Sequence, residues 1–294
     1  MRVLVTGASG QVGGAVAARF VAAGADVYGL SRRLPAAIPA ANHVQCDLRS
    51  AGTADFVARQ TERCDIVVHA AASLDKDLFA NDMVLANCLG TQEILKLAAR
   101  WNSFFAYVSG VAVIGRPRTL PITEDHPTDP ATAYHAAKLF GEHLTMVAGR
   151  AGLAAAVLRL TAPVGPGTPH DRILSVFVTR ALSNQPIELS GRGTRQQDYV
   201  DVRDAAIAVE QCASTRAVGL FNVGSGRSIS NRELAGTCVS LLGSASSIGV
   251  NGRADPEDDV IWDVSIARAR QAFGYSPAYS LEDSIRAVAH RRRD

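Results

Sequence analysis

Short hydrophobic runs alternate with amphipathic segments along residues 1–160. This alternation is typical of β-α-β units, in which parallel strands are joined by helices that cover the sheet. We expect strands at 2–6, 26–30, 43–46, 65–69, 104–109 and 155–160. Helices are expected between them, most clearly at 11–23, 82–100 and 131–148. The pattern predicts an α/β fold with a doubly wound parallel sheet of the Rossmann type.

The chain changes character after Leu160, because residues 161–170 contain three prolines and two glycines. This composition predicts a loop that leaves the sheet. Beyond it we expect short strands at 187–189 and 219–223, and helices at 173–182, 203–213, 231–242, 265–272 and 281–290. The sequence therefore predicts a main domain at 1–162, with a return segment at about 198–224. A smaller α/β domain is expected from 163–197 and 225–294.

Composition narrows the class of protein. Hydrophobic residues make up 47% of the 294 positions and charged residues 20%, and no apolar run approaches the roughly 18 to 20 residues of a membrane span. The N-terminus enters a strand directly and does not resemble a signal peptide. Five widely spaced cysteines indicate neither a disulfide framework nor a zinc site. With a net charge of only +2, we expect a soluble cytoplasmic protein without metal, nucleic-acid or membrane partners.

A glycine-rich segment, residues 7–13 (GASGQVG), stands between the first expected strand and the first expected helix. Glycines there permit a tight turn, close approach of the backbone to a pyrophosphate and close packing of helix on strand. The helix N-terminus supplies N–H donors and a partial positive charge. The main domain is therefore expected to bind a dinucleotide, with contacts from Gly7, Ser9, Gly10, Gln11 and Val12.

The end of the second strand indicates which dinucleotide is bound. NAD-binding chains usually carry an acidic residue there, which binds the ribose 2′-hydroxyl, whereas this chain has Leu30-Ser31-Arg32-Arg33. No carboxylate repels a 2′-phosphate, and a guanidinium can bind phosphate through two hydrogen bonds. NADP is therefore favoured over NAD, with Ser31 and Arg32 as the expected contacts. The alternative is that both arginines are simply solvated.

Two other strand ends are candidates for cofactor contacts. Asp47 follows the third strand and can accept a hydrogen bond from the adenine amine while Leu48 packs against the ring. The alternative for Asp47 is that it caps the next helix. The fourth strand ends in small residues, including Ala70 and Ala71, which allow a bulky cofactor to lie against the strand ends.

The segment YHAAK at 134–138 places Tyr134 and Lys138 on one face of a helix, because their spacing is four residues. A nearby ammonium favours the phenolate and lowers the pKa of a tyrosine from about 10 toward neutral pH. Proton exchange with an alcohol or a carbonyl requires such a group. With six tyrosines and three lysines in the chain, a pair at this spacing arises by chance in about 6% of such sequences.

The chain resembles the extended short-chain dehydrogenase/reductases, the NAD(P)-dependent epimerase/dehydratase family that acts largely on nucleotide sugars. The resemblance covers nearly the whole length. It rests on the segments TGASGQVG at 6–13, DIVVHAAA at 65–72, NCLGTQEIL at 87–95, YVSGVAVIG at 107–115, YHAAK at 134–138, LRLTAPVGPG at 158–167, QDYVDVRDAA at 197–206 and FNVGSG at 221–226. It implies that Tyr134 exchanges a proton with the substrate, that Lys138 also holds the nicotinamide ribose, and that Asn87 is a cofactor contact.

One departure from the family pattern concerns catalysis. A Ser or Thr usually stands five residues before the glycine that is Gly115 here, and its hydroxyl polarises the substrate oxygen; this chain has Gly110, with Ser109 just before it. Because successive strand residues face opposite sides, Ser109 takes that role only if the strand has already ended. A substrate hydroxyl or Thr161 are alternative donors. Loss of one such donor costs on the order of 10²- to 10³-fold in rate.

Two more departures concern the substrate. The Asn that contacts the diphosphate in nucleotide-sugar enzymes is replaced by Ala162, and the Arg before the Asp-aromatic pair is replaced by Gln197, with Arg195 two residues upstream. Arg253 fits the late pyrophosphate-binding arginine of the family. Within the smaller, substrate-binding domain and at its border, we expect substrate contacts from Ser109, Thr161, Arg195 and Arg253.

These features predict an NADP(H)-dependent oxidoreductase that reduces a keto group, with a 4-keto nucleotide sugar as candidate substrate. Dehydratases of the family that the chain resembles carry a Thr-Asp-Glu run in this segment, and residues 109–112 contain no acidic residue, so the resemblance disfavours dehydration. A nucleotide-sugar epimerase is one alternative, and an apolar ketone is another candidate substrate. Gly110 keeps open a third reading, a regulatory module that binds NADP without turnover. We also expect a homodimer through the helices at 82–100 and 131–148, although core packing explains their apolar residues equally well.

Overall fold

A seven-stranded sheet forms the centre of the molecule in a computed structural model, which describes every residue except 76, 78–80 and 294. The strand order is β10-β6-β5-β4-β1-β2-β3, and all neighbouring strands are parallel. The strands are β1 (Arg2–Thr6), β2 (Asp26–Ser31), β3 (His43–Gln45), β4 (Ile66–His69), β5 (Phe104–Gly110), β6 (Ala155–Leu160) and β10 (Gly219–Val223). The predicted doubly wound parallel sheet is confirmed.

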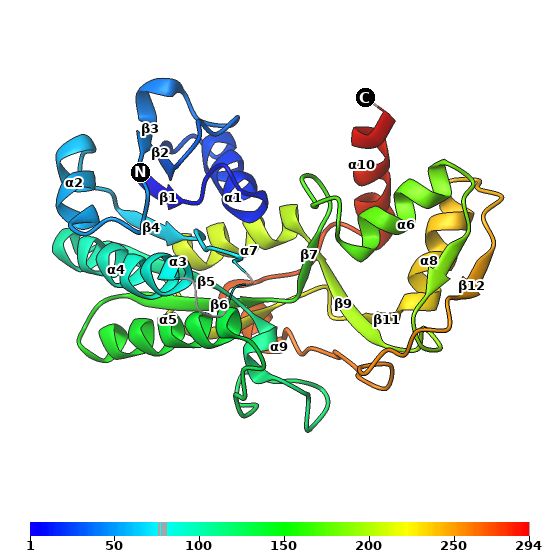
Figure 1. The fold of residues 1–294 in the computed structure, drawn as a ribbon. Coiled ribbons are helices and arrows are strands. Elements are labelled where there is room, and N and C mark those ends of the chain that lie inside the picture. The colour runs from blue at the N-terminus through cyan, green and yellow to red at the C-terminus, as the bar shows by residue number, and fades with distance from the viewer. Residues whose placement is uncertain (76, 78–80, 294) are drawn as a thin grey trace.

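Helices cover both faces of this sheet (Figure 1). One face packs against α1 (Gln11–Ala22), α7 (Val202–Thr215) and α9 (Ala267–Phe273) through a common core. The other face packs against α2 (Thr53–Gln60), α4 (Gly90–Trp101) and α5 (Ala133–Arg150). The helix expected at 82–100 is divided into α3 (Asn81–Met83), a π-helical segment η2 (Val84–Leu89) and α4. Two 3₁₀ turns, η1 (Ala40–Asn42) and η3 (Val111–Ile114), complete this part.

Helix α5 lies very close to β5 because Gly141 has no side chain. A Cβ at this position would stand 2.2 Å from the hydroxyl oxygen of Tyr107 on β5, which is far inside van der Waals contact. Tyr107 is 1% exposed and lies under the helix. This close approach sets the height of α5 above the sheet, and with it the position of Tyr134 and Lys138.

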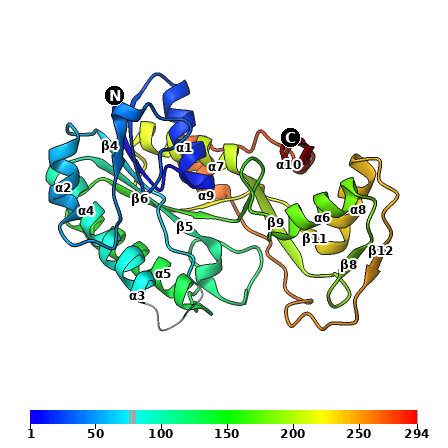
Figure 2. The same ribbon diagram turned by 45° about the horizontal axis from the view of Figure 1, so that its top comes forward.

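The second part of the molecule has its own small core, separate from the central sheet (Figure 2). It contains a three-stranded sheet of order β11-β9-β7, a pair of strands β12-β8, and three helices. The elements are β7 (Ala162–Val164), α6 (Ile173–Leu182), β8 (Ile187–Leu189), β9 (Gln196–Asp201), β11 (Ser228–Ser230), α8 (Asn231–Leu241), β12 (Ile248–Val250) and α10 (Leu281–Arg293).

For the segment after Leu160, the structure differs from the prediction. The chain does leave the central sheet there, but residues 162–164 form β7, which pairs with β9, and not a loop. Strands β9, β11 and β12 were not predicted either, whereas helix α2 was expected between β3 and β4, though without bounds. The domain boundaries at 162 and 224 stay a prediction. No helix within the described residues has the length and apolar character needed to cross a membrane.

Candidate functional site

The glycine turn between β1 and α1 has no room for side chains. A Cβ at Gly13 would lie 2.2 Å from the carbonyl oxygen of Gly7, and one at Gly7 would lie 2.8 Å from the backbone of Ala71. Gly7 also has a φ of +68°, a backbone conformation that residues with a side chain rarely adopt. The end of β4, including Ala70, is therefore packed directly against the turn.

The first turn of α1 can accept an anion. Among the described residues no side chain caps this helix at Gly10, and its first turn holds no acidic residue. The first N–H groups of a helix have no intrahelical partner and attract negative charge. The residues present therefore fit the pyrophosphate of a dinucleotide.

The predicted contacts at the turn differ in their surroundings. Ser9 and Gly10 are exposed, while Val12 packs on the core under α1. The Gln11 side chain donates a hydrogen bond of 3.1 Å to the Thr168 hydroxyl in the second part of the molecule. A groove of about 830 Å³ begins at Ser9, Gly10 and Gln11; its other lining residues include Arg33, Gly167, Arg203, Tyr279 and Arg291.

Strand β2 ends in a buried serine and two exposed arginines. The Ser31 hydroxyl donates to the carbonyl oxygen of Arg33 at 2.6 Å and thereby orders this loop. The Arg32 guanidinium is near enough to Asp47 to contribute to lowering the pKa of that carboxyl. Arg33, the arginine that was not named as an expected contact, lines the groove beside the glycine turn. The two arginines therefore flank the end of β2 on different sides.

Asp47 does not cap a helix, so that alternative is wrong. Its carboxylate accepts hydrogen bonds from the backbone N–H and from Nε of Arg49, both at 3.0 Å. Arg49 is the main reason why the pKa of Asp47 is lowered. The next helix, α2, begins only at Thr53. Leu48 lies against Gly90, where a Cβ would come within 2.9 Å of the leucine side chain.

A chain of hydrogen bonds joins β1 to the π-helical segment η2. His69, at the end of β4, is hydrogen-bonded to Thr6 through Nδ1 at 2.7 Å and to Thr91 through Nε2 at 2.9 Å. Thr91 donates to the carbonyl oxygen of Asn87 at 2.7 Å. The Asn87 amide binds the backbone N–H and carbonyl of Ser73 at 2.7 and 2.9 Å. Asn87 therefore clamps the loop after β4.

Lys138 is buried against the sheet. It is 4% exposed, its ammonium donates to the Val108 carbonyl on β5 at 2.8 Å, and it lies 4.9 Å from the centre of the Tyr107 ring. Burial lowers the pKa of Lys138 to about 8, and the Glu142 carboxylate acts in the opposite direction. Burial and, to a lesser extent, the Lys138 charge lower the pKa of His69 to about 3, so that imidazole is neutral.

Tyr134 lies in the first turn of α5, where the Thr132 side chain caps the helix by accepting from the His135 N–H at 3.2 Å. Burial raises the pKa of Tyr134, and Arg172 at the start of α6 partly offsets this effect. The expectation that Lys138 lowers the pKa of this phenol is therefore wrong for this structure. Desolvation of the phenolate is the largest influence, and the ammonium is hydrogen-bonded to the sheet.

Strand β5 continues through Gly110, so the condition under which Ser109 would replace the missing hydroxyl is not met. Ser109 is 5% exposed, and its Oγ has no hydrogen-bond partner among the described residues. Gly110 has an extended backbone, with φ −133° and ψ 144°. A Cβ there would have one near neighbour within the described chain, the Leu160 carbonyl oxygen at 3.8 Å. Space for a side chain therefore exists at 110.

The predicted substrate contacts differ in how far their polar groups are already bonded within the protein. Thr161 is buried and donates its hydroxyl proton to the Asp198 carboxylate at 3.1 Å. Arg195 forms an ion pair with Glu257 at 2.7 Å. Arg253 is exposed, and its backbone carbonyl accepts from Gly191 at 2.7 Å.

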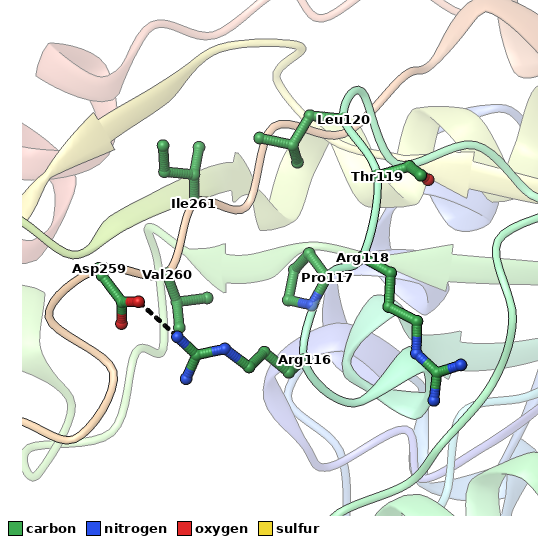
Figure 3. A pocket seen from close by; sticks show the side chains of 8 residues that line it. All are labelled: Arg116, Pro117, Arg118, Thr119, Leu120, Asp259, Val260 and Ile261. Atoms are coloured by element: carbon green, nitrogen blue, oxygen red, sulfur yellow. Dashed lines mark hydrogen bonds and ion pairs between the residues drawn. The ribbon is translucent and has the colours of Figure 1, made fainter.

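A second pocket, of about 270 Å³, is lined by residues 116–120 and 259–261 (Figure 3). Arg116 and Asp259 form an ion pair of 2.5 Å across it. This pocket contains none of the predicted site residues.

Several buried polar residues near the site were not predicted from the sequence. Glu142 on α5 and Arg159 on β6 form an ion pair inside the protein. Asp198 accepts hydrogen bonds from the Ser225 and Gly226 backbone N–H groups. A signal for Arg159 did exist, because a charged residue stands inside the otherwise apolar strand AAVLRL.

Three comparisons relate the chain to known proteins. The sequence profile of the NAD dependent epimerase/dehydratase family matches residues 3–224. The chain is 29% identical to the dTDP-6-deoxy-L-talose 4-dehydrogenase (NAD(P)(+)) of Kitasatospora kifunensis, over 97% of this chain and 93% of that protein. It is 31% identical to the UDP-glucose 4-epimerase of Azospirillum brasilense, over 97% of this chain and 89% of that protein.

Among solved structures, the Thermus thermophilus UDP-glucose 4-epimerase in complex with NAD superposes with a TM-score of 0.84. The alignment covers 100% of this chain and 99% of that one, at 24% sequence identity. The two proteins therefore share a fold over their whole length.

Proposed function

Because the chain belongs to the NAD dependent epimerase/dehydratase family, we propose that it is an NADP(H)-dependent oxidoreductase that reduces a keto group. Family membership makes it an NAD(P)-dependent enzyme. The proposal for its reaction depends on one observation, the placement of half-buried Tyr134 and buried Lys138 one helical turn apart on α5. Desolvation raises the pKa of the phenol further above neutral pH, and the Lys138 ammonium donates to the Val108 carbonyl of the sheet.

The cofactor would lie along the carboxyl ends of the strands. The glycine turn, with Gly7, Ser9, Gly10, Gln11 and Val12, would hold the pyrophosphate. Other proposed contacts are Ser31, Arg32 and Arg33 for the 2′-phosphate end, Asp47 and Leu48 for adenine, and Ala70, Ala71 and Lys138 for the nicotinamide half. Asn87 would act through the loop that it clamps at Ser73. Bound NADPH would supply the hydride that adds to the substrate carbonyl carbon.

The protonation state of Tyr134 favours reduction. When a carbonyl gains a hydride, its oxygen must gain a proton, and a phenol whose pKa is raised is protonated and able to donate one. The Lys138 ammonium would then stabilise the phenolate until a proton from water restores the phenol. Alcohol oxidation requires the phenolate at the start, which burial disfavours.

The proposed substrate class is supported by similarity to a known enzyme and by an exposed arginine. The Kitasatospora kifunensis relative is named for a dTDP-sugar and for position 4 of its ring, which supports a 4-keto nucleotide sugar here. Arg253 is exposed and fits a diphosphate. Arg195 would have to release Glu257 to do the same. Thr161 is a weak candidate, since its proton is already donated to Asp198. The Ser109 hydroxyl has no partner among the described residues, but β5 continues through Gly110, so Ser109 does not take the place of the family's hydroxyl.

A nucleotide-sugar epimerase is the second candidate, because the Azospirillum brasilense relative is a UDP-glucose 4-epimerase. An epimerase retains and recycles its nicotinamide, whereas a reductase consumes it. An absorbance spectrum of the purified protein separates the two. A stoichiometric bound cofactor favours the epimerase, and consumption of added NADPH with a keto sugar favours the reductase.

The Tyr134→Phe variant tests catalysis. With NADPH and a panel of 4-keto nucleotide sugars, we expect kcat to fall at least about 100-fold, because the proton donor is removed. The dissociation constant for NADPH should stay within about two-fold. Tyr28→Phe, on β2, is the control and should keep full activity. If Tyr134→Phe retains both the affinity for NADPH and the function of the unaltered protein, the result would instead favour a regulatory module that binds NADP without turnover.

Cofactor preference is tested at the end of β2. Arg32→Ala and Arg33→Ala should each weaken NADPH binding by about 10-fold or more, since a charge-assisted hydrogen bond to phosphate is lost. NADH binding, measured in the same titration calorimetry series, should hardly change. The control is Arg270→Ala, which removes an exposed arginine on α9. Equal binding of both cofactors by the unaltered enzyme would overturn the preference for NADP.

The open space at position 110 allows a gain-of-function test. Gly110→Ser adds a hydroxyl where the family usually has one, and the extended backbone accepts the side chain without strain. We expect kcat to rise by about 10-fold or more. Gly110→Ala fills the same space without a hydroxyl and is the matched control. If serine and alanine give the same rate, the reaction does not lack a donor at this position.

We propose that the enzyme is a homodimer formed through η2 and α5. Large apolar side chains are exposed there, namely Val84 (56%), Leu89 (49%), Phe140 (42%) and Val147 (50%). Phe140 and Val147 are two helical turns apart and form one stripe. Light scattering should give twice the chain mass for the unaltered protein and the monomer mass for Phe140→Glu/Val147→Glu. Val218→Glu, at an apolar residue 61% exposed elsewhere, should remain dimeric.

A further inference from the structure

An ion pair is buried between α5 and the central sheet. Arg159, the second-last residue of β6, and Glu142, on α5, each have a side chain only 4% exposed. The guanidinium makes three contacts with the carboxylate, Nε to Oε1 at 3.0 Å, Nε to Oε2 at 3.1 Å and Nη2 to Oε2 at 2.7 Å. Removing two charges from water costs desolvation free energy, and apolar residues of similar volume often stabilise a fold equally well. The pair therefore calls for an explanation other than stability.

The pair lies next to the predicted catalytic residues. Tyr134, Lys138 and Glu142 follow one another at intervals of four residues, so they share one face of α5. Lys138 donates to the carbonyl of Val108 on β5, and the next residue of that strand, Ser109, is paired in register with Arg159. Glu142 is thus one helical turn from Lys138 and is held by the neighbouring strand.

Apart from the Glu142–Arg159 pair, the titratable groups that the described residues place near Lys138 are neutral. On β4, the pKa of His69 is lowered to about 3. Burial raises the pKa of Tyr107 on β5, of Cys88 on η2 and of Tyr134 on α5, so none of them carries a negative charge at pH 7. Burial itself disfavours the ammonium, and Glu142 is the group that opposes this effect.

We propose that Glu142, fixed by Arg159, is a positioning residue for Lys138: its carboxylate keeps the ammonium charged where the Val108 carbonyl holds it, one helical turn from Tyr134. A carboxylate free to rotate would not supply its charge from a constant place, and the three contacts from Arg159 prevent that rotation. The inference rests on the proposed function, since it assigns Lys138 a part in the reaction. The positioning itself is measurable without turnover.

Titration of Lys138 by NMR is the test. The chain has only three lysines, Lys76, Lys96 and Lys138, so lysine labelled with ¹³C at Cε gives a simple spectrum, and Lys138→Met identifies the signal. We expect a midpoint of about 8 in the unaltered protein. Glu142→Gln should lower it by about one pH unit or more, because an opposite charge is removed. Glu142→Asp, which retains the charge, should restore most of the shift.

Loss of Glu142 alone leaves Arg159 uncompensated and destabilises the fold, so a second variant is needed. Glu142→Leu/Arg159→Met replaces both charges by apolar groups and should also show a lowered midpoint, with an intact circular dichroism spectrum. Asp55→Asn, which breaks the exposed Asp55–Arg100 ion pair, is the control and should leave the midpoint unchanged.

An unchanged midpoint in the folded double variant would overturn the inference and make the pair purely structural. If the midpoint falls as expected, the alkaline limb of kcat/KM should move by the same amount. A lowered midpoint in a protein that reduces none of the keto sugars would refute the proposed function and leave the positioning intact.

Discussion

Backbone atoms of the glycine turn and of the end of β4 approach so closely that no Cβ fits between them. Gly13 lies over the Gly7 carbonyl, and Gly7 lies over Ala71. The same approach brings Thr6 within hydrogen-bond distance of His69, which in turn reaches Thr91 on α4. The steric constraint at the turn thus fixes the ends of β1 and β4 and the helices α1 and α4 relative to each other. The remaining site is built on that frame.

Burial acts on the two predicted catalytic residues in opposite senses. It raises the pKa of Tyr134 and lowers that of Lys138, since each loses part of the hydration of its charged form. In the protein without ligands both effects favour a neutral phenol. A neutral phenol is the form of Tyr134 that can donate a proton, as reduction requires. Burial disfavours the charged form of Lys138, so the groups around Lys138 must keep its ammonium protonated.

The sequence was most informative where a local pattern decides the structure. All seven strands of the central sheet and the helix carrying Tyr134 and Lys138 were predicted to within a few residues. Outside that sheet, β8 was predicted, but β7, β9, β11 and β12 were not. Three of these four strands have only three residues, too few to show a period. The sign of the pKa shift at Tyr134 also escaped prediction, since spacing along a helix says nothing about desolvation. The partner of Arg159 could not be predicted because the pairing joins a strand and a helix distant in sequence.

The strand order has a consequence for how the chain is assembled. Strand β10 completes the sheet beside β6, although β7, α6, β8, β9 and α7 are made between them. Until residues 219–223 leave the ribosome, β6 presents an unpaired, mostly apolar edge, the kind of surface to which other nascent chains adhere. Newly made protein therefore passes through an interval in which it is prone to aggregate, and this interval ends only when β10, the last strand of the central sheet, docks.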